Sequence, residues 1–155
     1  RCDRLVELVD TGRFDVVLVA GGMSLVHLTM HEKLVPAAKK HDVGVILGGA
    51  FRQGISAQLL AKQPDSINQM LKTGEYPMGM DEATARKILA LYDIADEFGV
   101  TMPELTIRFV LAHDAVHTHI AGARCVDHIS ENYRAALKGP LPKEAVDKIR
   151  KLNGC

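Results

Sequence analysis

Neither sign of charge dominates this chain, whose 155 residues include 19 basic and 19 acidic side chains. This balance removes the electrostatic case for binding nucleic acid or an anionic membrane surface. The chain also lacks any apolar run that approaches the length of a membrane-spanning helix. We therefore expect no nucleic-acid partner and no membrane partner.

Cysteine is scarce as well, and the three cysteines are scattered, odd in number and without metal-like spacing. Reduced thiols in a cytoplasmic protein are the state we expect from such a pattern. His113, His117 and His119 raise the alternative of a zinc site. Because zinc would need a fourth ligand and a fixed geometry, we expect no metal site.

The length and composition fit one globular domain. With 47% hydrophobic and 25% charged residues, the chain is long enough for one core and too short for two. It opens on Arg1, within an expected helix and without an initiator Met. We therefore expect residues 1–155 to be a single domain and a fragment of a larger chain.

Three segments are predicted to be strands. Residues 14–20 and 43–47 are almost continuously apolar and end in glycine pairs, which is typical of parallel strands buried on both faces. Residues 116–120 form a third, β-branched segment. A sheet of only three parallel strands leaves one face without partners, so we expect an incomplete architecture.

Helical periodicity and capping residues predict that most of the remaining chain is helical. Asp81 is expected to cap one helix, and Thr101 to cap the next, with Glu104 completing a capping box. Pro36 predicts a kink or a late start in the helix around it. Residues 50–80 are loosely patterned and predict short helical turns or a functional lid. The expected helices cover residues 1–10, 31–41, 81–98, 101–112, 126–137 and 142–152.

The alternation of strands and helices predicts an α/β fold with a parallel sheet. After the third strand, a turn of small residues leads into the helix at 126–137. Such a turn presents free backbone N–H groups and the positive end of the helix dipole, which is a common way to hold phosphate. Glu131 and Asn132 follow within reach of whatever such a phosphate carries.

Three segments taken together resemble the aldo-keto reductase family, particularly its bacterial branch of fucose, galactose and related aldose dehydrogenases. They are residues 14–21, residues 45–51 with Gly54 and Ile55, and residues 122–124 with Glu131 and Asn132. The resemblance implies the C-terminal half of a (β/α)8 barrel, comprising its last three strands. It also implies a nicotinamide cofactor bound in an extended pose without a Rossmann fold, and the absence of a G-x-G-x-x-G motif agrees.

The resemblance implies a cofactor site at the strand ends. Gly122, Ala123 and Arg124 correspond to positions at the adenosine ribose and its phosphate, and Glu131 and Asn132 to positions at the adenine edge. Without the resemblance, Glu131 and Asn132 would be ordinary exposed helix residues, and Arg124 could equally form a surface salt bridge.

The implied site continues along the second strand. Gly48 stands where many relatives carry an aromatic ring that stacks on the nicotinamide, and Gly49 to Gly54 would pass near the pyrophosphate. The alternative for these glycines is a tight turn with no further role.

Several positions depart from the pattern of the family. Ala20 replaces a polar residue that binds the carboxamide in many members, and Ala121 replaces the usual proline. Gly122 and His128 stand where phosphate-selective members carry Lys and Arg. The cofactor is therefore NAD or NADP with NAD favoured, although Arg124 alone could serve NADP.

The resemblance implies hydride transfer between the nicotinamide and a sugar or small carbonyl substrate. In the family, a Tyr assisted by Lys, Asp and His carries the chemistry, and those four come from strands outside this chain. The three tyrosines here do not stand at strand ends beside such partners, so we assign no catalytic residue. We expect the chain alone to be inactive and to require the missing N-terminal half.

Two other interpretations stay open. The chain could be a non-catalytic half-barrel that acts as a nucleotide-binding or oligomerising module, with a homodimer mate covering its open face. A complete flavodoxin-like domain is a third possibility, but it needs more strands than the pattern contains.

Overall fold

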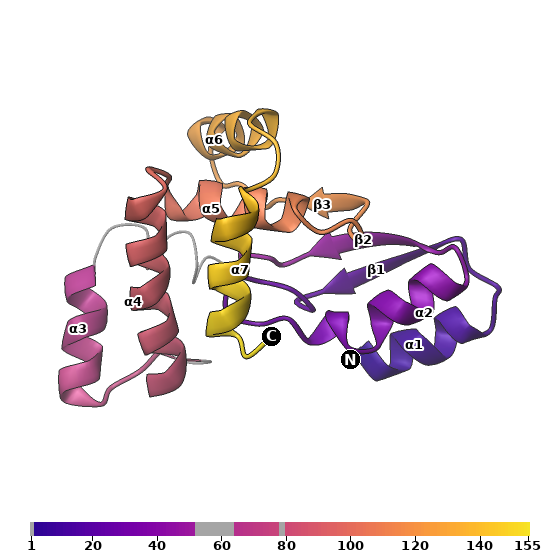
Figure 1. Ribbon diagram of the computed structural model, residues 1–155, viewed down its shortest axis with the longest axis horizontal. Helices are drawn as coiled ribbons and strands as arrows, with labels where there is room; N and C mark the ends of the chain where they lie inside the picture. The colour runs from indigo at the N-terminus through magenta and orange to yellow at the C-terminus, as the bar shows by residue number, and fades with distance from the viewer. Residues whose placement is uncertain (1, 52–63, 78–79) are drawn as a thin grey trace.

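A computed structural model describes residues 2–51, 64–77 and 80–155. Its sheet has three parallel strands in the order β1-β2-β3 (Figure 1). They are β1 (Val16–Ala20), β2 (Gly44–Gly48) and β3 (Thr118–Ile120). The three predicted strands and their parallel direction are confirmed. β1 and β3 each begin two residues later than predicted.

The two faces of the sheet differ sharply in exposure. Val17, Val19, Val45 and Leu47 point to one face and are buried in the main core. On the other face, Val16 is 53%, Leu18 52% and Ile120 52% exposed. The prediction that residues 14–20 are buried on both faces is therefore wrong, because in the described chain only one face of the sheet is covered. The expectation of a sheet face without partners is confirmed.

Helices α1 and α2 lie side by side along one side of the sheet (Figure 1). α1 (Cys2–Asp10) buries Val9, and α2 (Leu34–Lys40) buries four residues of its first two turns. A 3-10 turn, η1 (Thr29–His31), precedes α2. Pro36 lies in the first turn of α2, where proline is tolerated, so the predicted late start is confirmed.

The loosely patterned segment contains a full helix, α3 (Pro64–Thr73), rather than short turns alone. It packs against α4 (Glu82–Glu97), at the end of the molecule away from α1 (Figure 1). Asp81 caps α4 as predicted, because its Oδ1 accepts the N–H of Thr84 at 2.7 Å. No helix in the described ranges is both long and apolar enough to cross a membrane.

The last three helices are α5 (Met102–Leu111), α6 (Val126–Leu137) and α7 (Lys143–Leu152). α5 packs against both α4 and α6, and α7 packs against α4. Beyond the end of α7, Asn153 Nδ2 donates to the carbonyl oxygen of Leu25 at 2.8 Å. This bond ties the C-terminal end of α7 to the loop that follows β1.

A buried histidine joins α5 to η1 within the core. His113 is 2% exposed, and its ring packs on Phe109 and His31 at centroid distances of 4.6 and 4.8 Å. Its Nδ1 lies 2.7 Å from the carbonyl oxygen of Phe109, which makes Nδ1–H the donor. Burial lowers the pKa of His113 to about 4, and the nearby His31 and Arg150 act in the same direction. Burial also lowers the pKa of His31.

These shifts predict that the protein loses stability as the pH falls from about 6.5 towards 4. Unfolding returns His113 to its ordinary pKa near 6.5, so the unfolded chain binds more protons in this window. The contribution of neutral His113 to the free energy of unfolding is fully present above about pH 6.5. It is lost towards pH 4, and the loss is roughly 3 kcal/mol at most. Urea unfolding at pH 4.5 and pH 7 measures the difference.

The matched variants for this prediction are His113→Gln and His41→Gln. We expect His113→Gln to reduce the pH dependence, since Gln does not titrate. His41→Gln changes the half-buried C-cap residue of α2, outside the His113 cluster, and should leave the pH dependence in place. An unchanged pH dependence in His113→Gln would contradict the assignment.

Candidate functional site

The turns that follow β1 and β2 touch each other at the carboxyl edge of the sheet. The N–H of Gly21 donates to the carbonyl oxygen of Gly48 at 2.9 Å. Gly49 has a φ of 73°, and a Cβ there would lie 3.3 Å from the Gly21 nitrogen. Both the backbone conformation and the close approach therefore require glycine at position 49.

The loop after β3 opens onto the same edge, because Ile120 is the register partner of Gly48. Gly122, Ala123 and Arg124 are all exposed in this loop. A Cβ on Gly122 would meet nothing within 4 Å, so the space beside the loop is open. The N–H of Arg124 donates to His128 Nδ1 over a long 3.5 Å contact.

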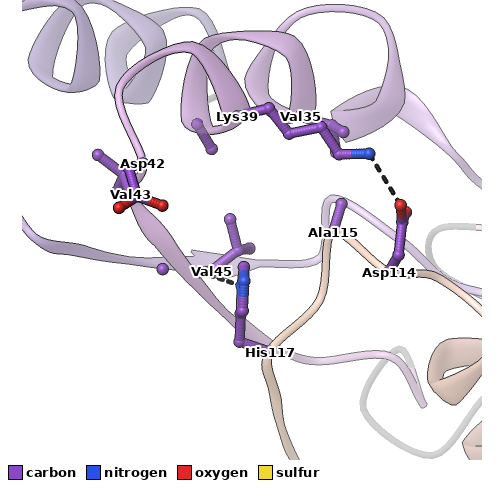
Figure 2. A pocket seen from close by; sticks show the side chains of 10 residues that line it. Val35, Lys39, Asp42, Val43, Val45, Asp114, Ala115 and His117 are labelled. Atoms are coloured by element: carbon purple, nitrogen blue, oxygen red, sulfur yellow. Dashed lines mark hydrogen bonds and ion pairs between the residues drawn. The ribbon is translucent and has the colours of Figure 1, made fainter.

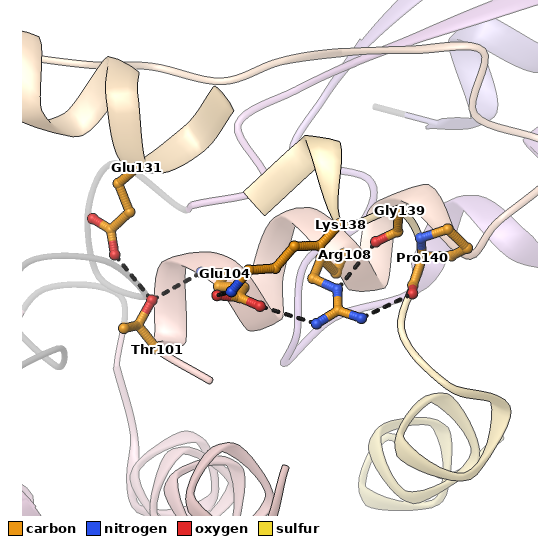
Figure 3. Close-up of polar contacts among 7 residues, drawn as sticks. All are labelled: Thr101, Glu104, Arg108, Glu131, Lys138, Gly139 and Pro140. Carbon is orange, nitrogen blue, oxygen red and sulfur yellow. Dashed lines mark hydrogen bonds and ion pairs between the residues drawn. The ribbon is translucent and has the colours of Figure 1, made fainter. Parts of the chain in front are cut away.

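Helix α6 brings its two predicted site residues to different neighbours. Asn132 Nδ2 donates to the carbonyl oxygen of Gly122 at 3.4 Å, which joins the helix to the loop. Glu131 Oε1 instead accepts from Thr101 Oγ1 at 2.9 Å (Figure 3). The structure therefore places residues 122–124 and 131–132 in one region, with Gly48 at the end of the adjoining strand and Gly49 in the turn that follows it. Gly54 lies outside the described residues.

The C-terminal end of α6 is held to α5 by an ion cluster that sequence reasoning missed (Figure 3). Glu104 is 8% exposed, and its two oxygens accept from Arg108 Nη1 at 2.9 Å and Lys138 Nζ at 2.7 Å. Arg108 also donates to the carbonyl oxygens of Gly139 and Pro140. Glu104 was expected to complete a capping box, but both of its oxygens serve this cluster.

The cluster keeps Glu104 ionised. Burial alone would raise the pKa of this carboxyl, but the hydrogen bonds from Lys138 and Arg108 outweigh it and lower the pKa below its usual value. Only the i,i+4 spacing of Glu104 and Arg108 could have been noticed in the sequence.

The three clustered histidines do not converge on a metal site. His113 packs in the core, while His117 Nδ1 accepts the N–H of Val45 at 3.1 Å. His119 lies beside Phe51, with 6.0 Å between the ring centroids, and burial lowers its pKa. Over the described ranges, no three His, Cys, Asp or Glu side chains are grouped to hold a metal ion.

A cavity of about 420 Å³ lies at the opposite, amino end of the sheet (Figure 2). It is lined by Gly44 at the start of β2 and by His117 just before β3, and the ion pair between Lys39 and Asp114 (3.0 Å) crosses its rim. Parallel α/β barrels place their sites at the carboxyl ends of the strands. The glycine turns and the α6 loop are therefore the candidate site, and this cavity is not.

Comparison with known sequences identifies related proteins. The sequence model of the Aldo/keto reductase family matches residues 2–154. The chain is similar to pyridoxal 4-dehydrogenase of Microbacterium luteolum, with 27% identity over 126 residues, 81% of this chain and 34% of that protein. It is also similar to the uncharacterized oxidoreductase YqkF of Bacillus subtilis (strain 168), with 27% identity over 121 residues, 77% of this chain and 37% of that protein.

Solved structures agree on the fold. The holo form of an aldo-keto reductase from Bacillus halodurans matches with a TM-score of 0.69 and 23% identity, covering 98% of this chain and 47% of that one. Its apo form matches with a TM-score of 0.63 and 21% identity, covering 98% and 48%. The chain thus spans about a third of the curated relatives and half of the solved ones, and its fold is a portion of a (β/α)8 barrel.

The ion cluster predicts that replacing Glu104 lowers the free energy of unfolding more than replacing an exposed glutamate does. Glu104→Ala leaves Arg108 and Lys138 without their carboxylate, and we expect the free energy of unfolding to fall by about 2 kcal/mol. Denaturant unfolding at pH 7 measures this change.

Glu82→Ala is the matched control, since Glu82 and Arg86 form the same i,i+4 pair on the exposed surface of α4. Its expected cost is below about 0.5 kcal/mol. Equal costs for the two variants would contradict the structural role assigned to Glu104.

Proposed function

We propose that this chain, which belongs to the aldo/keto reductase family, forms the cofactor-binding half of an NAD(P)-dependent oxidoreductase. The substrate of the whole protein is a sugar or another small carbonyl compound. The observation that carries the proposal is the joining of the Gly122 loop to Asn132 beside the glycine turns of β1 and β2. The relation to a dehydrogenase and to a second oxidoreductase supports the same chemistry.

The residues at this edge suit the adenosine end of a dinucleotide. The exposed guanidinium of Arg124 offers charged donors to a phosphate. Glu131 offers only acceptors and Asn132 offers a donor, which complements the amino group and ring nitrogen of adenine. Gly122 and Ala123 leave the backbone open to the ribose, and Gly48 places no side chain at the end of β2.

The choice between NAD and NADP follows from charge. Arg124 is the cation we assign to the phosphate, whereas Gly122 carries no side chain and His128 is half-buried beside the Arg124 N–H. A 2′-phosphate favours several charged donors, so NAD is the preferred cofactor. When bound, the nicotinamide accepts or supplies the hydride.

The groups that move protons to or from the substrate lie elsewhere in this proposal. None of the three tyrosines lies at the described strand ends: Tyr76 lies between α3 and α4, Tyr92 within α4, and Tyr133 is exposed on α6. We therefore assign this chain to binding and orienting the cofactor, and the first half of the barrel to catalysis.

A second candidate function is a nucleotide-binding half-barrel that assembles with a copy of itself. The exposed apolar face of Val16, Leu18 and Ile120 favours it, since such a face needs a cover. The two candidates share the cofactor site and differ in what covers the sheet.

The cofactor assignment predicts binding by the 155-residue chain itself. In calorimetric titrations, Asn132→Ala should weaken NAD binding about tenfold through loss of a hydrogen bond at the base. Arg124→Ala should weaken NADP binding at least as much, through loss of a charge-assisted contact. Arg134→Ala, an exposed arginine further along α6, is the control and should change neither. Equal affinity in all four proteins would remove the adenosine-site assignment.

Because we assign catalysis to the first half of the barrel, we expect that the purified 155-residue chain, with its mass verified, does not oxidise NADH or NADPH with sugars or small aldehydes. Turnover by the chain would overturn this assignment of catalysis.

Sedimentation of the wild type and of Leu18→Glu separates the two candidate functions. A dimer that Leu18→Glu dissociates without loss of NAD binding would favour the self-assembling module.

A further inference from the structure

Thr101 makes two hydrogen bonds through one hydroxyl group, one within the first turn of α5 and one to α6 (Figure 3). As the N-cap of α5, its Oγ1 accepts the N–H of Glu104 at 3.2 Å. The same Oγ1 donates to Glu131 Oε1 at 2.9 Å. A hydroxyl has one proton and two lone pairs, so it can cap the helix and donate to the carboxylate at once.

The bond to Thr101 restricts Glu131. A glutamate on a helix surface ordinarily samples many rotamers, and a fixed oxygen removes much of that freedom. With Oε1 held, Oε2 keeps its full capacity to accept a hydrogen bond. Among the described residues, Thr101 is the hydrogen-bonding partner of the Glu131 side chain.

We propose that Thr101 is a positioning residue for base recognition: it orients Glu131 so that the free carboxylate oxygen accepts from the exocyclic amino group of adenine. The inference rests on the proposed function, in which an adenine dinucleotide lies along α6. It assigns the preference for adenine over hypoxanthine, which carries a carbonyl oxygen in place of the amino group, to a residue on the neighbouring helix.

Helix capping alone does not need this arrangement. Asp81 caps α4 with a carboxylate oxygen, which can accept but not donate. An aspartate at position 101 would therefore satisfy the cap of α5. It would also place a negative charge beside Glu131 and turn the carboxylate away, so the two roles of Thr101 are separable.

A second set of contacts holds α6 on α5, so loss of the Thr101 hydroxyl affects only the orientation of the Glu131 side chain. Lys138 Nζ bonds Glu104 Oε2, and Arg108 bonds the carbonyl oxygens of Gly139 and Pro140, so α6 stays on α5 when the Thr101 hydroxyl is lost. A change in base preference would then report the orientation of Glu131 and not a displaced helix.

The test compares binding of NAD and of nicotinamide hypoxanthine dinucleotide to the 155-residue chain by calorimetry. We expect the wild type to prefer the adenine form by about tenfold, the value of one charge-assisted hydrogen bond. Thr101→Ser keeps the hydroxyl and should keep this preference. Thr101→Asp should reduce it to less than about twofold while its midpoint of thermal unfolding stays near that of Thr101→Ser.

Each other outcome overturns the inference in a distinguishable way. An undiminished preference in Thr101→Asp, or a lost preference in Thr101→Ser, would remove the role of the hydroxyl while leaving the cofactor site intact. A wild type that binds both dinucleotides equally would remove base recognition by Glu131. A wild type that binds neither would overturn the proposed function as well.

Discussion

The placement of the candidate site depends on β2, because this strand carries both parallel pairings of the sheet. Its register sets Ala20 of β1 opposite Gly48, and Gly48 opposite Ile120 of β3. All three strands therefore end on one line, and the turns that follow them emerge at the same edge. A slip of one residue would move Val45 and Leu47 from the core to the open face, so burial of these side chains stabilises the register and the alignment of the site together.

Helix α6 is held in place largely by polar contacts. The apolar cluster at this helix is small, with Ala135 packed alongside Phe51 and Ile107. Glu104 compensates for this by joining Arg108 on its own helix to Lys138 on α6. Such contacts are directional, so they set the rotation of α6 about its own axis as well as its distance from α5. That rotation decides which α6 residues face the loop after β3 and which face α5.

Local patterns in the sequence account for most of the fold. The periodicity over 126–137 and the caps at Asp81 and Thr101 match the structure because they depend on neighbouring residues. The burial of β1 could not be predicted in this way, since an apolar run is the same whether a second layer covers it or not. Lys138 lies 34 residues from Glu104, and no local pattern indicates that contact. Asn132 lies only ten residues after Gly122, so the sequence could place it near that loop, but their hydrogen bond is visible only in the structure.

The two ends of the proposed cofactor site differ in whether they depend on a cover over the exposed face of the sheet. The bonds that place Glu131 and Asn132 run to Thr101 and Gly122, and none of these four residues depends on a cover over Val16 and Leu18. The adenosine end is therefore organised by α5, α6 and the loop between β3 and α6. The face of the sheet that carries Leu18 and Ile120 is exposed, so the surroundings of a nicotinamide ring depend on whatever covers it. In the proposed function, affinity for the dinucleotide and reactivity of its ring are therefore assigned to different parts of the fold, and affinity is the part assigned to this chain.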